Sequence, residues 1–359
     1  MPLILIDFVP SSRHNSFQDH CLHLFEKLSQ KLVKGRERVP RAFSRAFQLV
    51  HTIDKIALPS VSTFDVATAF EFDMYLKHPS EVKISYHHAC IIISDSGNQR
   101  MLFFDLMSKK FIFSLNIESC HFCVQENYDQ MEHDALLLIS SKMFLWNYCM
   151  KCDLQFLLQN SKSKDSIDDS KLVEKNCLWK SQSLSNVTGI CVSRTYAFIS
   201  ELVSKTIYVL NLSSGLVVQT ISLEGSPFRS DVIFDSSLFY VIEQKDEKSR
   251  DYRIKIFFLE KNDLRSPPKW KIVKSFGDMR EGKVNSPKGI CILDKREGSE
   301  FLLSSTTTTT TLQKNRIQIF RFGRCVKSFT TVKGLSGICL NEFTGELLVC
   351  HTREVSIYK

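Results

Sequence analysis

The sequence predicts an all-β protein, a single β-propeller of six blades. A phrase of short apolar segments separated by polar turns returns six times along the chain, at intervals of about fifty residues. Most copies hold four segments rich in valine, isoleucine, phenylalanine and tyrosine, which is typical of strands joined by tight turns. Four antiparallel strands in each of six copies indicate a propeller, because each blade then buries both faces against its neighbours.

Composition supports a large folded core and excludes several classes of protein. The chain has 359 residues, of which 43% are hydrophobic and 24% charged, so it is neither disordered nor collagen-like. No apolar segment reaches the length of a membrane span. The first nine residues include Asp7 and lack a basic leader, so a cleaved secretory signal is not expected. We therefore expect an intracellular, cytoplasmic protein that does not use a membrane, and a nuclear location is compatible with the same features.

The clearest copy of the repeat defines the pattern, with predicted strands at 79–84, 90–95 and 98–105. Three further copies match it well, with predicted strands at 187–192, 196–201 and 206–211, at 287–292, 301–304 and 315–320, and at 336–340, 346–350 and 354–358. Two weaker copies place strands at 232–234, 239–242 and 254–257, and at 123–124, 136–139 and 143–146. A fourth strand follows in most copies, for example at 216–221 and 325–329.

The two ends of the chain are predicted to complete one blade together. The last copy stops at Lys359, directly after its third strand, while the segment 47–53 alternates as an outer strand does. We expect this segment to pair with the C-terminal blade and to close the ring, because closure removes an exposed sheet edge.

Residues 1–39 are predicted to form a helix and a basic linker ahead of a propeller at 40–359. Within 15–33, apolar residues recur every three or four positions, with Ser16 as a candidate cap and Gly35 as a stop. The apolar face of this short amphipathic helix comprises Phe17, Cys21, Leu24, Phe25, Leu28 and Leu32. Two roles stay open: packing on the propeller or on a second copy, and docking into a groove of another protein.

Positive charge is concentrated in the linker that follows the helix. The chain has a formal net charge of +8, and six basic residues face one acid, Glu37, in this segment. These basic residues are Lys31, Lys34, Arg36, Arg38, Arg41 and Arg45. Two interpretations stay open, a solvated linker and a contact with RNA or an acidic partner.

Two polar segments are expected to be solvated connections. Residues 160–171 are rich in serine, lysine and aspartate and separate the second and third blades. Residues 306–311 are six threonines within the fifth blade. Such compositions favour lengthened loops over a second domain.

Four of the twelve cysteines have the spacing of a zinc ribbon. They are Cys120, Cys123, Cys149 and Cys152. In the predicted propeller the first pair begins an innermost strand, and the second pair lies at the turn between the third and fourth strands of that blade. The two pairs would then lie on opposite faces of the disc, roughly 15 Å apart. We therefore predict no metal site.

Three other cysteines share one repeated slot on the innermost strand. Cys191, Cys291 and Cys339 each follow Gly-Ile, where a small residue fits between converging blades. A nucleophilic cysteine would need a neighbouring base, yet the histidines recur in no such slot. Four histidines are predicted at the surface, namely His51, His78, His87 and His88.

The innermost strands offer few groups for catalysis. Propeller enzymes hold metals at the central axis through carboxylates and histidines, but here Glu81 and Asp231 are the exceptions on nearly ligand-free strands. No phosphate-binding loop, serine elbow or nucleotide fingerprint occurs. We predict no enzymatic activity, no cofactor and no small-molecule substrate.

The clearest copy resembles an NHL repeat. The resemblance rests on Ser-Asp-Ser-Gly-Asn-Gln-Arg at 94–100, and the segment 314–320 is similar to the second half of such a repeat. The family's acidic residue after the second strand is matched by Asp95 and Glu201, whereas Ser304 and Cys350 depart from the pattern. The resemblance extends over residues 40–359.

The resemblance implies a non-catalytic protein-interaction module or scaffold. NHL propellers often recognise the substrates of ubiquitin ligases, whose RING segment binds zinc. Because only Cys21 precedes residue 90, this chain would act with a ligase supplied in trans. Some NHL propellers bind RNA on a basic face, so an RNA-binding propeller that uses the basic linker or a basic face is the alternative. A lyase or lactonase acting in the central channel is a third hypothesis.

Overall fold

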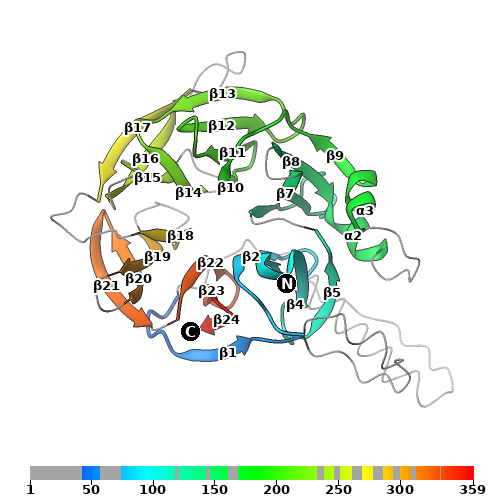
Figure 1. Cartoon of the computed structure of the whole chain (residues 1–359), viewed down its shortest axis with the longest axis horizontal. Helices are drawn as coiled ribbons and strands as arrows, with labels where there is room; N and C mark the ends of the chain where they lie inside the picture. The colour runs from blue at the N-terminus through cyan, green and yellow to red at the C-terminus, as the bar shows by residue number, and fades with distance from the viewer. Residues whose placement is uncertain are drawn as a thin grey trace, which may run out of the picture. The chain divides into compact units, whose positions relative to one another are not determined.

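Six four-stranded antiparallel sheets surround a central axis in the computed structural model (Figure 1). The structure describes residues 43–56, 74–117, 121–142, 146–160, 169–232, 238–245, 251–260, 269–277, 286–293, 300–308, 313–331 and 333–359. These residues confirm the predicted six-bladed propeller. The predicted helix at 15–33, with all six residues of its apolar face, lies outside them. None of the helices in the described ranges is long and apolar enough to cross a membrane.

Each blade is numbered here by its order along the chain, with its innermost strand first. Blade 1 comprises β2 (Pro79–Ser85), β3 (Cys90–Asp95), β4 (Arg100–Asp105) and β5 (Phe111–Leu115). Blade 2 comprises β6 (Phe122–Gln125), β7 (Ala135–Lys142), β8 (Trp146–Asp153) and β9 (Cys177–Lys180). Blade 3 comprises β10 (Val187–Val192), β11 (Tyr196–Glu201), β12 (Thr206–Asn211) and β13 (Val217–Ser222). A 3-10 turn, η2 (Ser96–Asn98), joins β3 to β4.

Blade 4 comprises β14 (Ser226–Val232), β15 (Leu238–Gln244), β16 (Tyr252–Glu260) and β17 (Lys269–Phe276). Blade 5 comprises β18 (Pro287–Ile292), β19 (Glu300–Thr308), β20 (Gln313–Arg321) and β21 (Arg324–Thr331). Blade 6 comprises β22 (Leu335–Asn341), β23 (Glu346–His351), β24 (Val355–Tyr358) and β1 (Leu49–Ile53). The threonine run therefore begins inside strand β19, and residues 309–311 lie outside the described residues.

The outer strand of blade 6 comes from the start of the described chain, as the sequence predicts. Strand β1 pairs antiparallel with β24, and Ile53 lies opposite Val355. The pairing continues past the strand ends, because the amide of Gln48 donates to the carbonyl of Lys359 (3.0 Å) and the reverse bond measures 2.8 Å. Closure of the ring is confirmed.

The segment before β1 packs against the ring. Phe47 stacks on Phe329 with ring centroids 4.9 Å apart, and Phe43 meets Phe47 edge to face. Both phenylalanines are buried in the cluster that joins blades 5 and 6. Residues 43–48 therefore contribute to the propeller core in addition to the closing strand.

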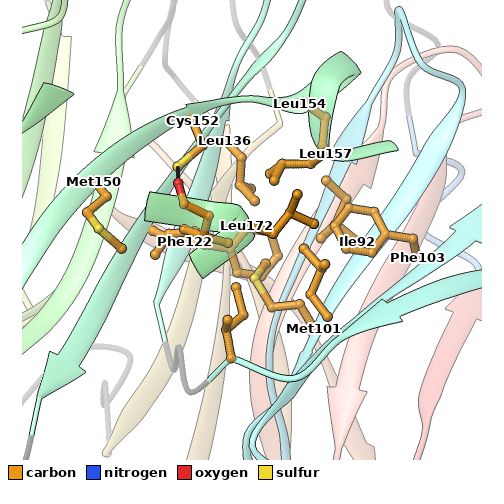
Figure 2. Packing of buried hydrophobic residues seen from close by; sticks show 14 of the residues in the cluster. Ile92, Met101, Phe103, Phe122, Leu136, Met150, Cys152, Leu154, Leu157 and Leu172 are labelled. Atoms are coloured by element: carbon orange, nitrogen blue, oxygen red, sulfur yellow. Dashed lines mark hydrogen bonds between the residues drawn. The ribbon is translucent and has the colours of Figure 1, made fainter. Parts of the chain in front are cut away.

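Neighbouring blades are joined by a hydrophobic cluster at each of the six seams. Figure 2 shows the seam between blades 1 and 2, where Phe103 faces Phe122 and Leu136 across the cluster. Side chains on both faces of the middle strand β3 are buried, and its residues 90–93 are all apolar. Ring closure thus buries both faces of every blade.

Three sequence predictions need correction. The third strand of blade 2 is β8, not 143–146, because polar residues alternate along β8 and hide its pattern. The innermost strand of blade 4 is β14, not 232–234. The apolar pattern missed β14 because the strand carries the charged residues Arg229 and Asp231 toward the axis. The polar segment at 160–171 lies partly outside the described residues, but it ends in a helix, α3 (Asp169–Lys175), that follows α2 (Leu154–Asn160) in the β8–β9 connection.

A polar side chain recurs at one position of the second strand, next to the innermost strand, in five blades, and we call this position the polar slot. The slot lies opposite the inner-strand residue that precedes a register shift in five blades, and its occupants are Asp95, Glu201, Glu243, Ser305 and His351. The three carboxylates accept backbone amides from the preceding connection, those of Lys77 (2.6 Å), Ser185 (2.5 Å) and Gly225 (2.7 Å). The register shift follows this pair in all five blades, and the pairing shows that Ser305 and His351, not Ser304 and Cys350, stand in the register of the acids.

Closure predicts that loss of the C-terminal blade unfolds the whole ring. A chain lacking its last twenty residues should lose cooperative unfolding in a thermal melt followed by circular dichroism, because blades 5 and 1 would expose apolar faces. The point variant Ile53→Ala should cost about 2–5 kcal/mol of unfolding free energy. Leu49→Ala, on the half-exposed end of β1, should change stability by less than about 0.5 kcal/mol. A truncated chain that melts near the full-length temperature would contradict this account.

His351 predicts a loss of stability in acid. Burial lowers the pKa of His351 to about 4, whereas an unfolded histidine titrates near 6.5. The unfolded chain therefore binds a proton first, so stability present above pH 6.5 is lost as the pH falls toward 4, at about 1.4 kcal/mol per unit. Urea unfolding at several pH values should show this loss in the wild type and in exposed His51→Gln, but less of it in His351→Gln. Equal pH slopes in all three proteins would disprove the prediction.

Candidate functional site at the propeller hub

The innermost strands bring two residues from each blade to the central axis. Figure 1 shows β2, β10, β14, β18 and β22 around this axis. Ladder register places one ring at Glu81, His121, Gly189, Arg229, Gly289 and Gly337, and a second ring at Lys83, Cys123, Cys191, Asp231, Cys291 and Cys339. We call these twelve residues the hub.

Glycine in the first ring allows neighbouring inner strands to approach closely. A Cβ on Gly337 would lie 2.8 Å from the Cα of Glu81, and one on Gly289 would lie 2.8 Å from the carbonyl oxygen of Ser336. Both distances are shorter than van der Waals contact, so any larger residue would push the blades apart. The glycines of three blades leave the remaining space of the first ring to the side chains of Glu81, His121 and Arg229.

Arg229 links opposite sides of the hub. Its Nη1 donates to Oε2 of Glu81 (2.7 Å) in blade 1 and to Nδ1 of His121 (2.6 Å) beside blade 2. A guanidinium has no acceptor, so Nδ1 of His121 must accept and the imidazole is neutral. Burial, followed by the charge of Arg229, lowers the pKa of His121 well below its ordinary value. One arginine thus connects three blades through two hydrogen bonds.

Lys83 and Asp231 place a second pair of opposite charges in the hub. Nζ of Lys83 lies 3.2 Å from Oε1 of Glu81. Burial alone would lower the pKa of Lys83, but Glu81, the neighbouring thiols and Asp231 raise it above its ordinary value. Asp231 accepts the amide of Ile292 in blade 5 (2.9 Å). Two bases and two acids are therefore balanced around the axis.

Two of the four hub cysteines, Cys123 and Cys191, are held as neutral thiols. The predicted slot is confirmed, because Cys191, Cys291 and Cys339 occupy the same register on three inner strands. Burial raises the pKa of Cys123 and of Cys191 well above the usual range. A protonated thiol is a poor nucleophile, so these two side chains act as small core residues.

The sequence pattern alone did not show what the other blades place in the cysteine slot. Cys123 fills it in blade 2, while Lys83 and Asp231 fill it in blades 1 and 4. His121 and Arg229 were likewise absent from the predicted candidates. A strict alignment of all six innermost strands would reveal them, but blade 2 and blade 4 are the two weak copies.

The zinc-ribbon spacing does not produce a cluster among the residues described. Cys149 and Cys152 lie within β8 and not at a turn. Their odd spacing directs them to opposite faces of the strand, so Cys149 packs with Cys123 between blades 2 and 3 while Cys152 faces blade 1. Cys120 lies outside the described residues. In the part of the chain that is described, no three histidine, cysteine or acidic side chains are arranged to hold a metal ion.

Of the six basic linker candidates, the structure describes Arg45. Its Nη2 lies 2.7 Å from Oε2 of Glu300, a carboxylate that also pairs with Arg321 at 3.2 Å. This arginine is therefore bound to blade 5. The other five candidates, Lys31, Lys34, Arg36, Arg38 and Arg41, lie outside the described residues.

A second polar cluster links blades 1 and 2 away from the axis. Asp134 accepts from the Ser85 hydroxyl (2.5 Å) and lies 2.7 Å from Nδ1 of His87. The carboxylate stands between serine and histidine, so the order differs from that of a catalytic triad, in which the histidine faces the nucleophile. His87 and His88 are half-buried, while His51 and His78 are exposed as predicted. The partner of His87 comes from another blade, which spacing along the chain could not show.

Comparison with known proteins supports the fold alone. No protein-family model matches the chain, and no curated protein matches it significantly. The chain is similar to a solved structure titled Kuenenia stuttgartiensis hydrazine synthase, at 11% identity and a TM-score of 0.50, over 80% of this chain and 77% of that one. Another match is the β-propeller domain of Cps50 (Swd1) from Myceliophteria thermophila, at 11% identity and a TM-score of 0.49, over 80% and 84%. The resemblance to NHL repeats stays a prediction.

The hub predicts that Arg229 is required for stability. Arg229→Met should reduce the free energy of unfolding by about 3–5 kcal/mol, because it leaves Glu81 buried without its strongest partner. Exposed Arg353→Met should change it by less than about 0.5 kcal/mol. Urea denaturation measures both, and similar values for the two variants would show that the hub pairing contributes little.

Proposed function

We propose that this chain is a non-catalytic interaction module that binds an acidic protein partner at the outer rim of blades 4 and 5. A propeller ring is used for many unrelated activities, so the proposal has to rest on particular side chains. The distribution of charge among the outer strands carries it.

Basic residues gather on two of the six outer strands. Strands β17 and β21 together hold five basic and no acidic side chains, namely Lys269, Lys271, Lys274, Arg324 and Lys327. The outer strands of the other four blades, β1, β5, β9 and β13, hold one basic side chain, Lys180. All five side chains on β17 and β21 are exposed. Lys271 pairs with Glu260 on β16, and Nζ of Lys327 donates to the carbonyl of Arg45 (2.5 Å).

Exposed apolar side chains lie among these charges. Ile272 is 50% exposed, Val273 58%, Val326 51% and Phe322 67%. Nζ of Lys274 in blade 4 donates to the carbonyl of Phe322 in blade 5 (3.3 Å), which joins the two blades at this point. We call these nine residues the basic rim. Its combination of charge and apolar surface differs from that of a purely solvated edge.

The basic rim fits an extended acidic segment of another protein. An outermost strand has unpaired backbone groups that can accept an added strand, with side chains providing selectivity. Lysines on such an edge also oppose pairing between copies of the chain, since like charges repel. The carboxylates of an acidic strand would instead be attracted to these basic side chains, and its small apolar residues would cover the exposed Ile272, Val273 and Val326.

The hub supports the non-catalytic part of the proposal. Arg229, Glu81 and Lys83 are engaged with one another, and Asp231 accepts a backbone amide. Burial raises the pKa of the Cys123 and Cys191 thiols. This arrangement suits structural pairing better than a channel lyase or lactonase, which needs groups directed at a substrate. If the predicted NHL resemblance holds, the acidic partner would be a substrate presented to a ubiquitin ligase supplied in trans.

RNA is the alternative ligand, and the same five basic residues favour it. Three of the four exposed apolar residues of the basic rim are aliphatic, and Phe322 is its one aromatic side chain that could stack on a base, which is why we place protein first. RNA binding would depend steeply on salt concentration.

The test compares three forms of the full chain as baits in cells. The rim variant replaces Lys269, Lys271 and Lys274 with glutamate. The control variant replaces three exposed lysines elsewhere, Lys55, Lys110 and Lys245, with the same residue. We expect an acidic protein to be recovered with the wild type and the control, to be reduced at least about tenfold with the rim variant, and to resist ribonuclease.

Other results would contradict the proposal. Equal recovery with both variants would place binding elsewhere on the molecule. Recovery that disappears after ribonuclease, together with RNA crosslinked to the wild type and not to the rim variant, would establish the RNA alternative.

A further inference from the structure

Two cysteines lie opposite each other on neighbouring strands of blade 2. Cys152, near the end of β8, is the register partner of Cys177, the first residue of β9. Cys152 is fully buried in the seam between blades 1 and 2 (Figure 2). Cys177 is half-buried and packs against the same cluster. The pair therefore places two thiols side by side, and one of them is partly exposed to solvent.

The separation of the two residues suits a disulfide. Cα atoms of register partners in antiparallel strands lie about 4.5–5.5 Å apart, and disulfides join Cα atoms about 4.4–6.8 Å apart. In the reduced form the Cys152 thiol donates to the carbonyl of Val173 (3.7 Å), and Sγ of Cys177 lies 2.9 Å from the carbonyl oxygen of Trp179. Strand β8 has a bulge between Lys151 and Cys152, and the backbone next to the pair is therefore less constrained than a regular ladder.

The surroundings make Cys177 the more reactive of the two. The neighbouring Cys152 thiol and the charge of Lys180 outweigh burial and lower the pKa of Cys177 to about 7. The thiolate form is the nucleophile in disulfide exchange. The neighbouring Cys177 and burial raise the pKa of Cys152. The pair thus consists of one attacking and one resolving cysteine.

We propose that Cys152 and Cys177 form a reversible disulfide with glutathione disulfide as the oxidant. The Cys177 thiolate attacks one sulfur of glutathione disulfide and releases one glutathione thiolate, which leaves a mixed disulfide on Cys177. Cys152 then gives its proton to the departing thiolate and attacks Sγ of Cys177, and the second glutathione leaves. Two protein thiols are oxidised and one glutathione disulfide is reduced to two glutathione molecules.

The disulfide would stabilise the helical connection on the seam. Cys152 precedes α2 and Cys177 follows α3. Leu154 and Leu157 of α2, with Leu172 and Val173 of α3, are buried in the cluster between blades 1 and 2. A covalent bond at the base of this connection limits the ways in which both helices can leave the cluster.

Mass spectrometry of the full chain tests this proposal. The reduced protein is treated with glutathione disulfide, its remaining thiols are blocked with N-ethylmaleimide, and peptides are mapped over time. We expect one crosslinked pair, Cys152–Cys177, formed about tenfold faster than glutathione adds to half-buried Cys325, because a thiol with a pKa near 7 is mostly ionised at pH 7.4. Dithiothreitol should restore both thiols.

Three variants separate the steps. Cys152→Ser should leave glutathione attached to Cys177, because the resolving thiol is gone, and Cys177→Ser should abolish both products. Cys149→Ser, three residues away on the other face of β8, should still form the crosslink. A stable glutathione adduct on wild-type Cys177, or reaction of Cys177 no faster than that of Cys325, would overturn the proposal. The wild-type peptide map decides the question even if a variant fails to fold.

Discussion

Ring closure is the constraint on which the rest of the structure depends. A four-stranded blade has two apolar faces, and each face needs a neighbour. Strand β1 supplies the last strand of blade 6, next to β24, so that Ile53 and Ile357 join the cluster that also contains Val82 and Ile91 of blade 1. Once the ring is closed, all six innermost strands converge on one axis. The identity of the hub residues follows from that convergence.

Convergence explains why the hub combines glycines, thiols and a few charges. Little space is left where six strands approach, so three glycines allow backbones to come close and Arg229 extends across the axis. A buried charge is unfavourable unless it is paired, and Arg229, Glu81 and Lys83 satisfy one another within hydrogen-bonding distance. The same arrangement that stabilises the ring uses the polar groups that a catalytic site would need. This is the physical reason for looking to the rim for a binding surface.

The outer strands are under a different constraint, because they face solvent and no blade covers their edges. Charge there is not required for closure, and four of the six outer strands hold almost none. The concentration of lysine and arginine on β17 and β21 is therefore a property of this chain and not of the fold.

The sequence by itself determined the number of blades, the closing strand and the shared slot of Cys191, Cys291 and Cys339, because strand alternation and repeat spacing are local properties of the chain. It located poorly the strands whose residues face the hub or alternate with polar groups, as β14 and β8 show. Only the tertiary structure decided which residues meet across the axis, that Cys149 and Cys152 face opposite seams, and that Cys177 lies beside Cys152. These contacts join residues far apart in sequence, and the register of the strands and the closure of the ring determine them.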